Sequence, residues 1–150
     1  MLYSLYFLCA LFFTAPVSAP AESVESVLNG SWQGVIVPLE EAYRESYNLS
    51  FIIKEEDGII SGFSYISVDD IYSKMIIEGT LTNDLLFNGR DVSVDDHEIN
   101  QGMEWCMKNY NLLLKKENDV WKLEGFWSGT TSFSTCTPGR VYLKKVINRA

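Results

Sequence analysis

The links between the expected strands alternate in length along the whole chain. Apolar residues at every second position, separated by turn-forming residues, predict about eight strands. Three links are minimal, at Glu56-Asp57-Gly58, Asn83-Asp84 and Asn118-Asp119, whereas four are longer, at 39–46, about 68–72, about 89–103 and 128–139. Successive links of an up-and-down meander fall at opposite ends of the sheet. We therefore expect every long link at one end, where functional residues commonly lie.

The same alternation predicts which side chains face inward. No segment has a long helical period of apolar residues, so the domain is expected to be all-β. The expected inward residues are Leu49, Phe51 and Ile53 in the strand 47–55, Met75, Ile77 and Leu81 in 74–82, Tyr110, Leu112 and Leu114 in 104–117, and Trp121, Leu123 and Trp127 in 120–128.

A recurring glycine favours closure of these strands into a barrel. An aliphatic residue and a polar residue precede Gly62, Gly79 and Gly125. Glycine weakens a strand, so three in matching places indicate a backbone requirement such as the close approach of strongly coiled strands. A closed barrel also leaves no unpaired edge. The prediction is an eight-stranded antiparallel up-and-down barrel.

The N-terminal residues are expected to be a signal peptide. Residues 2–13 are almost wholly apolar, small residues follow, and Ala21 suits the cleavage rule. This run is short for a membrane span, so no stable span is expected after cleavage. We predict a signal peptide at 1–21 and one domain at 22–150, with 21–28 as a short helical lead-in, in a secreted or periplasmic protein.

The net charge limits the classes of binding partner, and the cysteine content predicts a disulfide. The formal net charge of −8 lies wholly beyond residue 21 and argues against nucleic acid and anionic membranes as partners. Cys106 and Cys136 remain after cleavage, and an even count in an exported chain predicts a disulfide. The spacings of a zinc site are missing, so neither a metal nor a cofactor is expected.

The start of the first strand resembles a known family. Gly30-Ser31-Trp32 follows a short lead-in, with Gly34 just beyond, and the lipocalins and their calycin relatives begin with Gly-x-Trp at this place. The resemblance implies a barrel that often holds a small apolar ligand. It also implies that Trp32 plugs the closed end beneath a basic residue, for which Arg149 is the first candidate and Lys145 the second. The Thr-Asp-Tyr signature and the long C-terminal helix of many lipocalins are missing.

Two groups of residues allow chemistry other than ligand binding. The acidic stretch of Asp91, Asp95, Asp96 and Glu98 surrounds the single histidine, His97, but fits no calcium loop. Glu104 beside Trp105 resembles a glycosidase carboxylate, although the mechanism needs a second one. Asn29 and Asn48 begin glycan acceptor triplets, which matter only in a eukaryotic source.

Aromatic residues expected near the open end predict the function best. They could line a pocket or simply fill the barrel. We predict an exported, non-enzymatic barrel that binds an apolar or amphipathic molecule at its open end. The alternatives are a solid protein-interaction module that uses its loops and, third, an enzyme acting on glycans through Glu104. The candidate ligand-binding residues are Tyr47, Tyr65, Phe87, Trp105, Tyr110 and Trp127.

Overall fold

The protein folds as a closed barrel in which eight antiparallel strands follow one another in chain order, confirming the predicted fold class. The computed structural model describes residues 26–40 and 42–147, so the predicted signal peptide and Arg149 lie outside the described residues. Within these two ranges, no helix is long and apolar enough to cross a membrane. The strands are β1 (Gly30–Pro38), β2 (Tyr47–Glu56), β3 (Ile59–Val68), β4 (Ile71–Thr82), β5 (Leu86–Glu98), β6 (Met107–Glu117), β7 (Val120–Thr130) and β8 (Gly139–Lys145).

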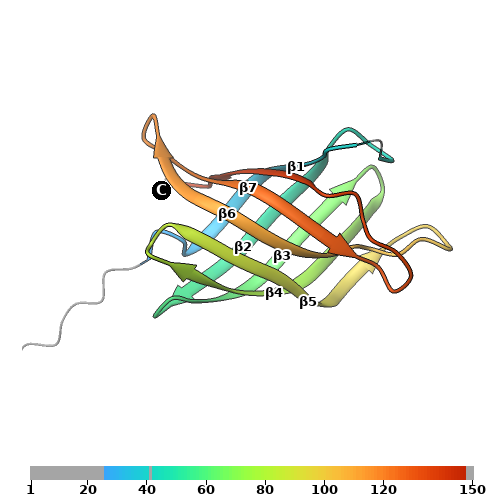
Figure 1. Ribbon diagram of the computed structural model, residues 1–150, viewed down its shortest axis with the longest axis horizontal. Helices are drawn as coiled ribbons and strands as arrows, with labels where there is room; N and C mark the ends of the chain where they lie inside the picture. The colour runs from blue at the N-terminus through green and yellow to red at the C-terminus, as the bar shows by residue number, and fades with distance from the viewer. Residues whose placement is uncertain (1–25, 41, 148–150) are drawn as a thin grey trace, which may run out of the picture.

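The links occupy the two ends of the barrel as predicted. The links 39–46, 69–70, 99–106 and 131–138 lie at one end, called the open end, and the turns 57–58, 83–85 and 118–119 lie at the other (Figure 1). The link near residue 70 was expected to be long. It is a two-residue turn, in which Asp69 takes a φ of 50°.

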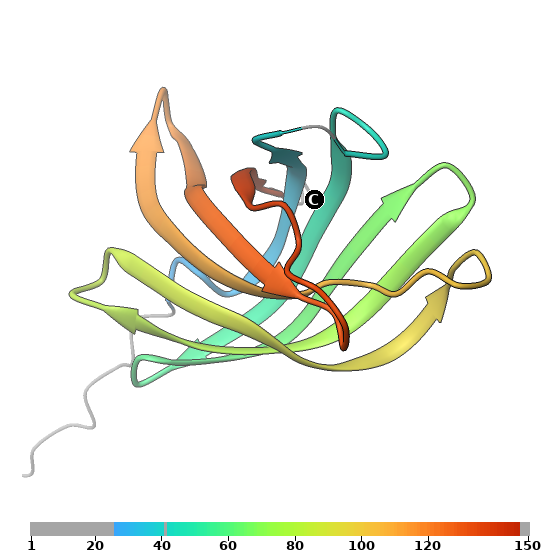
Figure 2. The same ribbon diagram turned by 45° about the vertical axis from the view of Figure 1, so that its right-hand side comes forward.

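Strand β5 is much longer than its sequence predicted. It was expected to fade near Arg90, but it continues to Glu98 because it pairs with β4 beyond that point, with two register shifts. An ion pair from Lys74 to Asp95 (2.7 Å) supports the extension. Pairing with β6, by contrast, ends at Arg90 and Asn109. The end of β5 therefore swings away from β6 and opens the wall of the barrel at the open end (Figure 2).

The interior of the barrel holds one hydrophobic core. The predicted inward residues of β2 and β6 are all buried, as are Met75, Ile77, Leu123 and Trp127. Phe51 lies at the centre, with its ring 5.1 Å from Tyr110 in a T-shaped contact and 5.9 Å from Phe87. Burial of such rings supplies most of the free energy that stabilises a domain of this size.

The recurring glycines lie where neighbouring strands approach closely, as predicted. A Cβ on Gly125 would collide with the backbone oxygen of Asn111 on β6, and one on Gly79 with that of Asn88 on β5. Gly62 meets β2 in the same way. Only glycine allows this approach without moving a strand, so these residues permit the coiling that closes the barrel.

Trp32 plugs the closed end. It is fully buried, and its indole N–H donates a hydrogen bond of 2.9 Å to the Leu28 carbonyl. The Lys145 ammonium lies 6.0 Å from the Trp32 ring and donates to the Val27 carbonyl at 2.6 Å. Lys145, the second candidate, thus occupies the predicted basic position. The expected lead-in helix is not seen at 26–29, where a turn is closed by a bond from the Asn29 amide to the Ser26 carbonyl (3.1 Å).

Candidate functional site

A cavity of about 400 Å³ opens between the links at the open end. Ile36 and Ile66 form part of its inner wall, and Trp127 is buried beside them. The cavity is largely apolar, as small-molecule sites usually are, and its size falls in their usual range. The other lining residues are Pro38, Ala42, Tyr43, Tyr47, Ile71, Ile99, Gly102, Met103, Glu104, Trp105, Cys106, Lys108, Thr131, Phe133, Ser134, Cys136 and Thr137.

The cavity brings together three of the six predicted ligand-binding aromatics: Tyr47, Trp105 and Trp127. Phe87 and Tyr110 are fully buried in the core. Phe87 lies near the closed end, because β5 starts there. Tyr65 lies on the outer face, since the alternation of β3 turns Ser64 and Ile66 inward.

The predicted disulfide is present and forms part of the cavity wall. Cys106, just before β6, is bonded to Cys136 in the link between β7 and β8, and both line the cavity. The Cys136 amide also donates to the Gly129 carbonyl at 2.9 Å. The bridge attaches the last link to the barrel. Disulfides of this kind are typical of oxidising compartments.

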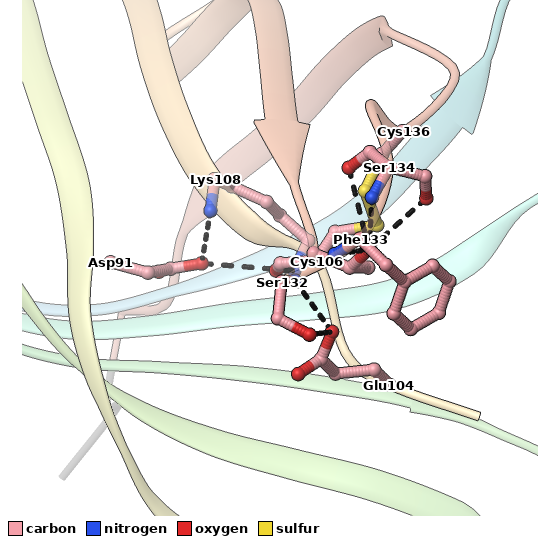
Figure 3. Close-up of a disulfide and its surroundings, with 9 residues drawn as sticks. Asp91, Glu104, Cys106, Lys108, Ser132, Phe133, Ser134 and Cys136 are labelled. Atoms are coloured by element: carbon pink, nitrogen blue, oxygen red, sulfur yellow. Dashed lines mark hydrogen bonds and ion pairs between the residues drawn. A yellow bond between two sulfur atoms is a disulfide. The ribbon is translucent and has the colours of Figure 1, made fainter. Parts of the chain in front are cut away.

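Glu104 holds the same link in place from the other side. Its Oε2 accepts hydrogen bonds from the Ser132 amide (2.6 Å) and the Ser132 hydroxyl (2.9 Å). Figure 3 shows Glu104, Ser132 and the disulfide together. Among the described residues that line the cavity, Glu104 is the only carboxylate. The second carboxylate that a glycosidase would need is not found in this lining.

A buried ion pair that the sequence analysis missed lies at the edge of the cavity. The Lys108 ammonium is 3.7 Å from Asp91 Oδ2, with side-chain exposures of 3% and 0%, respectively (Figure 3). The Ser64 hydroxyl donates to Asp91 Oδ1 at 2.8 Å, and the Tyr110 hydroxyl lies 3.4 Å from both carboxylate oxygens. Asp91, Ser64, Lys108 and Tyr110 all lie on strands of the barrel wall, and the Lys108 ammonium also donates to the Cys106 carbonyl, just before β6, at 2.7 Å.

Burial shifts the titration of this group. Burial raises the pKa of the Asp91 carboxyl, and the nearby Lys108 charge and the Ser64 hydrogen bond oppose that shift. Burial also lowers the pKa of Lys108, against the attraction of Asp91. The pKa of Tyr110 is raised well above its ordinary value by burial and by the Asp91 charge.

A signal for this pair existed in the sequence. Lys108 shares the every-second-residue pattern of Tyr110, Leu112 and Leu114, whose alternation predicts that they face the interior. Asp91 shares the pattern of Phe87 and Gly89. It was instead grouped with the acidic stretch, whose members Asp95, Asp96, His97 and Glu98 are exposed on β5. Within 26–40 and 42–147, no cluster of three or more His, Cys, Asp or Glu side chains could hold a metal ion.

Two other hollows differ in character. A cavity of about 280 Å³ adjoins the main one and shares Met103, Glu104 and Trp105 with it; its lining also includes His97. A larger hollow of about 730 Å³ lies against β3 to β6, and its lining includes polar side chains such as Asn88, Asn109 and Asn111. Exposed residues of the outer surface make up most of that lining, so the apolar cavity at the open end is the better ligand site.

Fold and site together define a class: an eight-stranded up-and-down β-barrel with an apolar cavity at its open end and a buried ion pair beside it. No protein-family model, curated protein or solved structure matches the chain. The lipocalin resemblance therefore stays a prediction.

Proposed function

We propose that the protein is an exported binding protein that takes a small apolar or amphipathic molecule into the cavity at the open end. The observation that carries this proposal is the cavity of about 400 Å³ with its apolar and aromatic lining. Transfer of apolar surface from water into such a site is favourable by roughly 25 cal/mol per Å². The disulfide at the cavity wall supports export, because such bonds persist in oxidising compartments.

The rigid wall supports binding rather than chemistry. The disulfide and the Glu104 contacts to Ser132 hold two links around the cavity, so little conformational freedom is lost when a ligand enters. Phe133, at the tip of the last link, lines the cavity and is 73% exposed. A ligand would cover part of this exposed apolar surface.

Titration with the uncharged fluorescent probe N-phenyl-1-naphthylamine tests the proposal. We expect saturable binding to the wild-type protein and quenching of the fluorescence of Trp105 and Trp127, which both line the cavity. Ile66→Trp, which adds volume inside the cavity, should weaken binding about tenfold or more, equivalent to about 1.4 kcal/mol. Ile76→Trp adds the same ring on the exposed outer face of β4 and should leave binding unchanged.

A matched pair of tryptophan variants locates the signal. The double variant Trp105→Phe with Trp127→Phe, which removes both tryptophans of the cavity lining, should remove most of the quenching. Trp121→Phe, changed in the closed half away from the lining, should retain it. If the wild-type protein binds neither the probe nor any apolar competitor, the proposal is wrong and the solid interaction module becomes the better reading.

A further inference from the structure

Lys108 is the only basic residue among the described residues that line the cavity. Its carboxylate partner, Asp91, is fully buried and is not part of the lining. A bound molecule would therefore meet the lysine side chain and not the carboxylate. This asymmetry determines which polar group of a ligand can be accommodated there.

The lysine has hydrogen-bonding capacity to spare. An ammonium has three donors, and the Cys106 carbonyl, at 2.7 Å, is the only hydrogen-bond acceptor it has in the part of the chain described. Asp91 Oδ2, at 3.7 Å, is beyond hydrogen-bond distance. The Asp91 carboxylate has more hydrogen-bond partners, because it accepts hydrogen bonds from the Ser64 hydroxyl and the Lys108 amide. The unmet requirement at this site is thus for an acceptor.

Two further donors in the wall agree with this. The indole N–H groups of Trp105 and Trp127 are buried without a hydrogen-bond partner within 26–40 and 42–147. A buried donor without an acceptor costs free energy. The wall of the cavity is therefore rich in donors.

The charge of the site excludes the simplest acceptor. Asp91 already balances the charge of Lys108, so a carboxylate ligand would bring an uncompensated negative charge into an apolar cavity. The net charge of −8 of the chain opposes an anion as well. A cationic ligand would meet Lys108 directly. An uncharged acceptor avoids both costs.

We propose that the ligand is an uncharged amphipathic molecule whose carbonyl oxygen, as in an ester or a ketone, accepts a hydrogen bond from the Lys108 ammonium. This inference rests on the proposed function, because it specifies the ligand of the same cavity. Asp91 acts as a positioning residue that neutralises the lysine and holds it beside the cavity.

Three probes with matched tails test the inference: decane, decanoate and methyl decanoate. Each displaces N-phenyl-1-naphthylamine from the wild-type protein at neutral pH and below its aggregation concentration. Methyl decanoate should bind about tenfold more tightly than decane and than decanoate, since a hydrogen bond from a charged donor is worth that much or more.

Variants of Asp91 and Lys108 should change the relative affinities for the three probes. Lys108→Met should lower the affinity for methyl decanoate about tenfold and leave that for decane unchanged. Asp91→Asn should raise the affinity for decanoate about tenfold, because the lysine is then an uncompensated cation. The double variant Asp91→Asn with Lys108→Met, which holds no charge at this site, should bind the ester and the alkane alike. Lys144→Met, on the outer face of β8, is the control and should match the wild-type protein.

Circular dichroism and thermal unfolding establish that each variant is folded, and the double variant remains informative if Asp91→Asn alone does not fold. Tighter binding of decanoate than of methyl decanoate by the wild-type protein would overturn the inference but leave the proposed function intact. An equal loss of affinity for all three probes in Lys108→Met would also overturn the inference and leave the proposed function intact. Failure of every probe, including the fluorescent one, overturns both.

Discussion

The Asp91 carboxylate accepts the backbone N–H of Lys108 at 3.0 Å, at the point where β5 and β6 stop pairing. The last paired residues are Arg90 and Asn109, so Asp91 and Lys108 would form the next pair of the ladder. A side-chain oxygen replaces the backbone carbonyl there. This hydrogen bond gives the buried Lys108 N–H an acceptor at the point where β5 leaves the barrel wall, and it places a charged pair beside the cavity.

Removal of this carboxylate should be the most damaging change at the open end. Asp91→Ala leaves the Lys108 amide without its acceptor and its ammonium without a counter-charge, so a loss of about 3–5 kcal/mol of unfolding free energy is expected. Urea denaturation measures it. Asp95→Ala breaks the partly exposed pair with Lys74 and should cost less than about 1 kcal/mol. Equal losses in the two variants would contradict a special role for Asp91.

The stability conferred by Asp91 should depend on pH. Burial raises the pKa of this carboxyl above its ordinary value of 3.8, so the folded state binds the proton more tightly than the unfolded chain. Ionisation of this carboxyl therefore lowers the unfolding free energy as pH rises from 3.8 through the raised pKa, and this cost is separate from what its hydrogen bonds and ion pair contribute. We expect the unfolding free energy of the wild-type protein, relative to Asp91→Asn, to fall with rising pH over this window. A difference that stays flat or rises would refute the shift.

The disulfide should stabilise the fold by restricting the conformations of the unfolded chain. Cys106 and Cys136 are separated by 30 positions, and closure of such a loop is worth about 3.5 kcal/mol on the chain-entropy model. The double serine variant should lose about that much, and its affinity for the fluorescent probe should fall because the link 131–138 is released. Addition of a reductant to the wild-type protein should reproduce both effects, and it should not affect the serine variant.

Glycine at position 125 should be irreplaceable. Gly125→Ala places a Cβ against the Asn111 backbone oxygen, and strands β6 and β7 must separate to admit it. A loss of about 1–3 kcal/mol is expected, as for other overpacked interiors. Ser128→Ala, at an exposed position of the same strand, should change stability by less than about 0.5 kcal/mol. Thermal unfolding distinguishes the two, and an unaffected Gly125→Ala would show that the approach is not required.

The closed end offers a comparison between adjacent lysines. Lys145→Met removes the hydrogen bond to the Val27 carbonyl and the contact with the Trp32 ring, so about 1–2 kcal/mol should be lost. Lys144→Met, exposed on the opposite face of β8, should be nearly neutral. If both variants unfold like the wild-type protein, Lys145 does not stabilise the plug.

Patterns of neighbouring residues predicted most of the barrel. The alternation of Leu49, Phe51 and Ile53 was enough to identify the inner face of β2, because side chains of a strand point to opposite faces in turn. The Asp57-Gly58 turn was equally clear. Alternation failed in β5 beyond Arg90, where a polar sequence forms a strand through its pairing with β4.

The site was less predictable for the same reason. Tyr47, Trp105 and Trp127 were recognised as residues near the open end, but Tyr65 and Phe87 were placed there as well. The direction of Tyr65 depends on the register of β3, and the level of Phe87 depends on which end of the barrel β5 starts from. The type of residue alone therefore predicts neither the direction of Tyr65 nor the level of Phe87.

Local patterns along the chain were enough to predict the presence of eight strands, the ends at which their links lie, the inner faces of most strands and the pairing of Cys106 with Cys136. These depend on local periodicity, turn chemistry and the count of cysteines. Three features became visible only in the folded barrel: β5 leaves β6 beyond Arg90, a cavity remains at the open end, and Asp91 and Lys108 meet beside it. Such features depend on strand register and on the packing of residues far apart in the chain, which no short segment encodes.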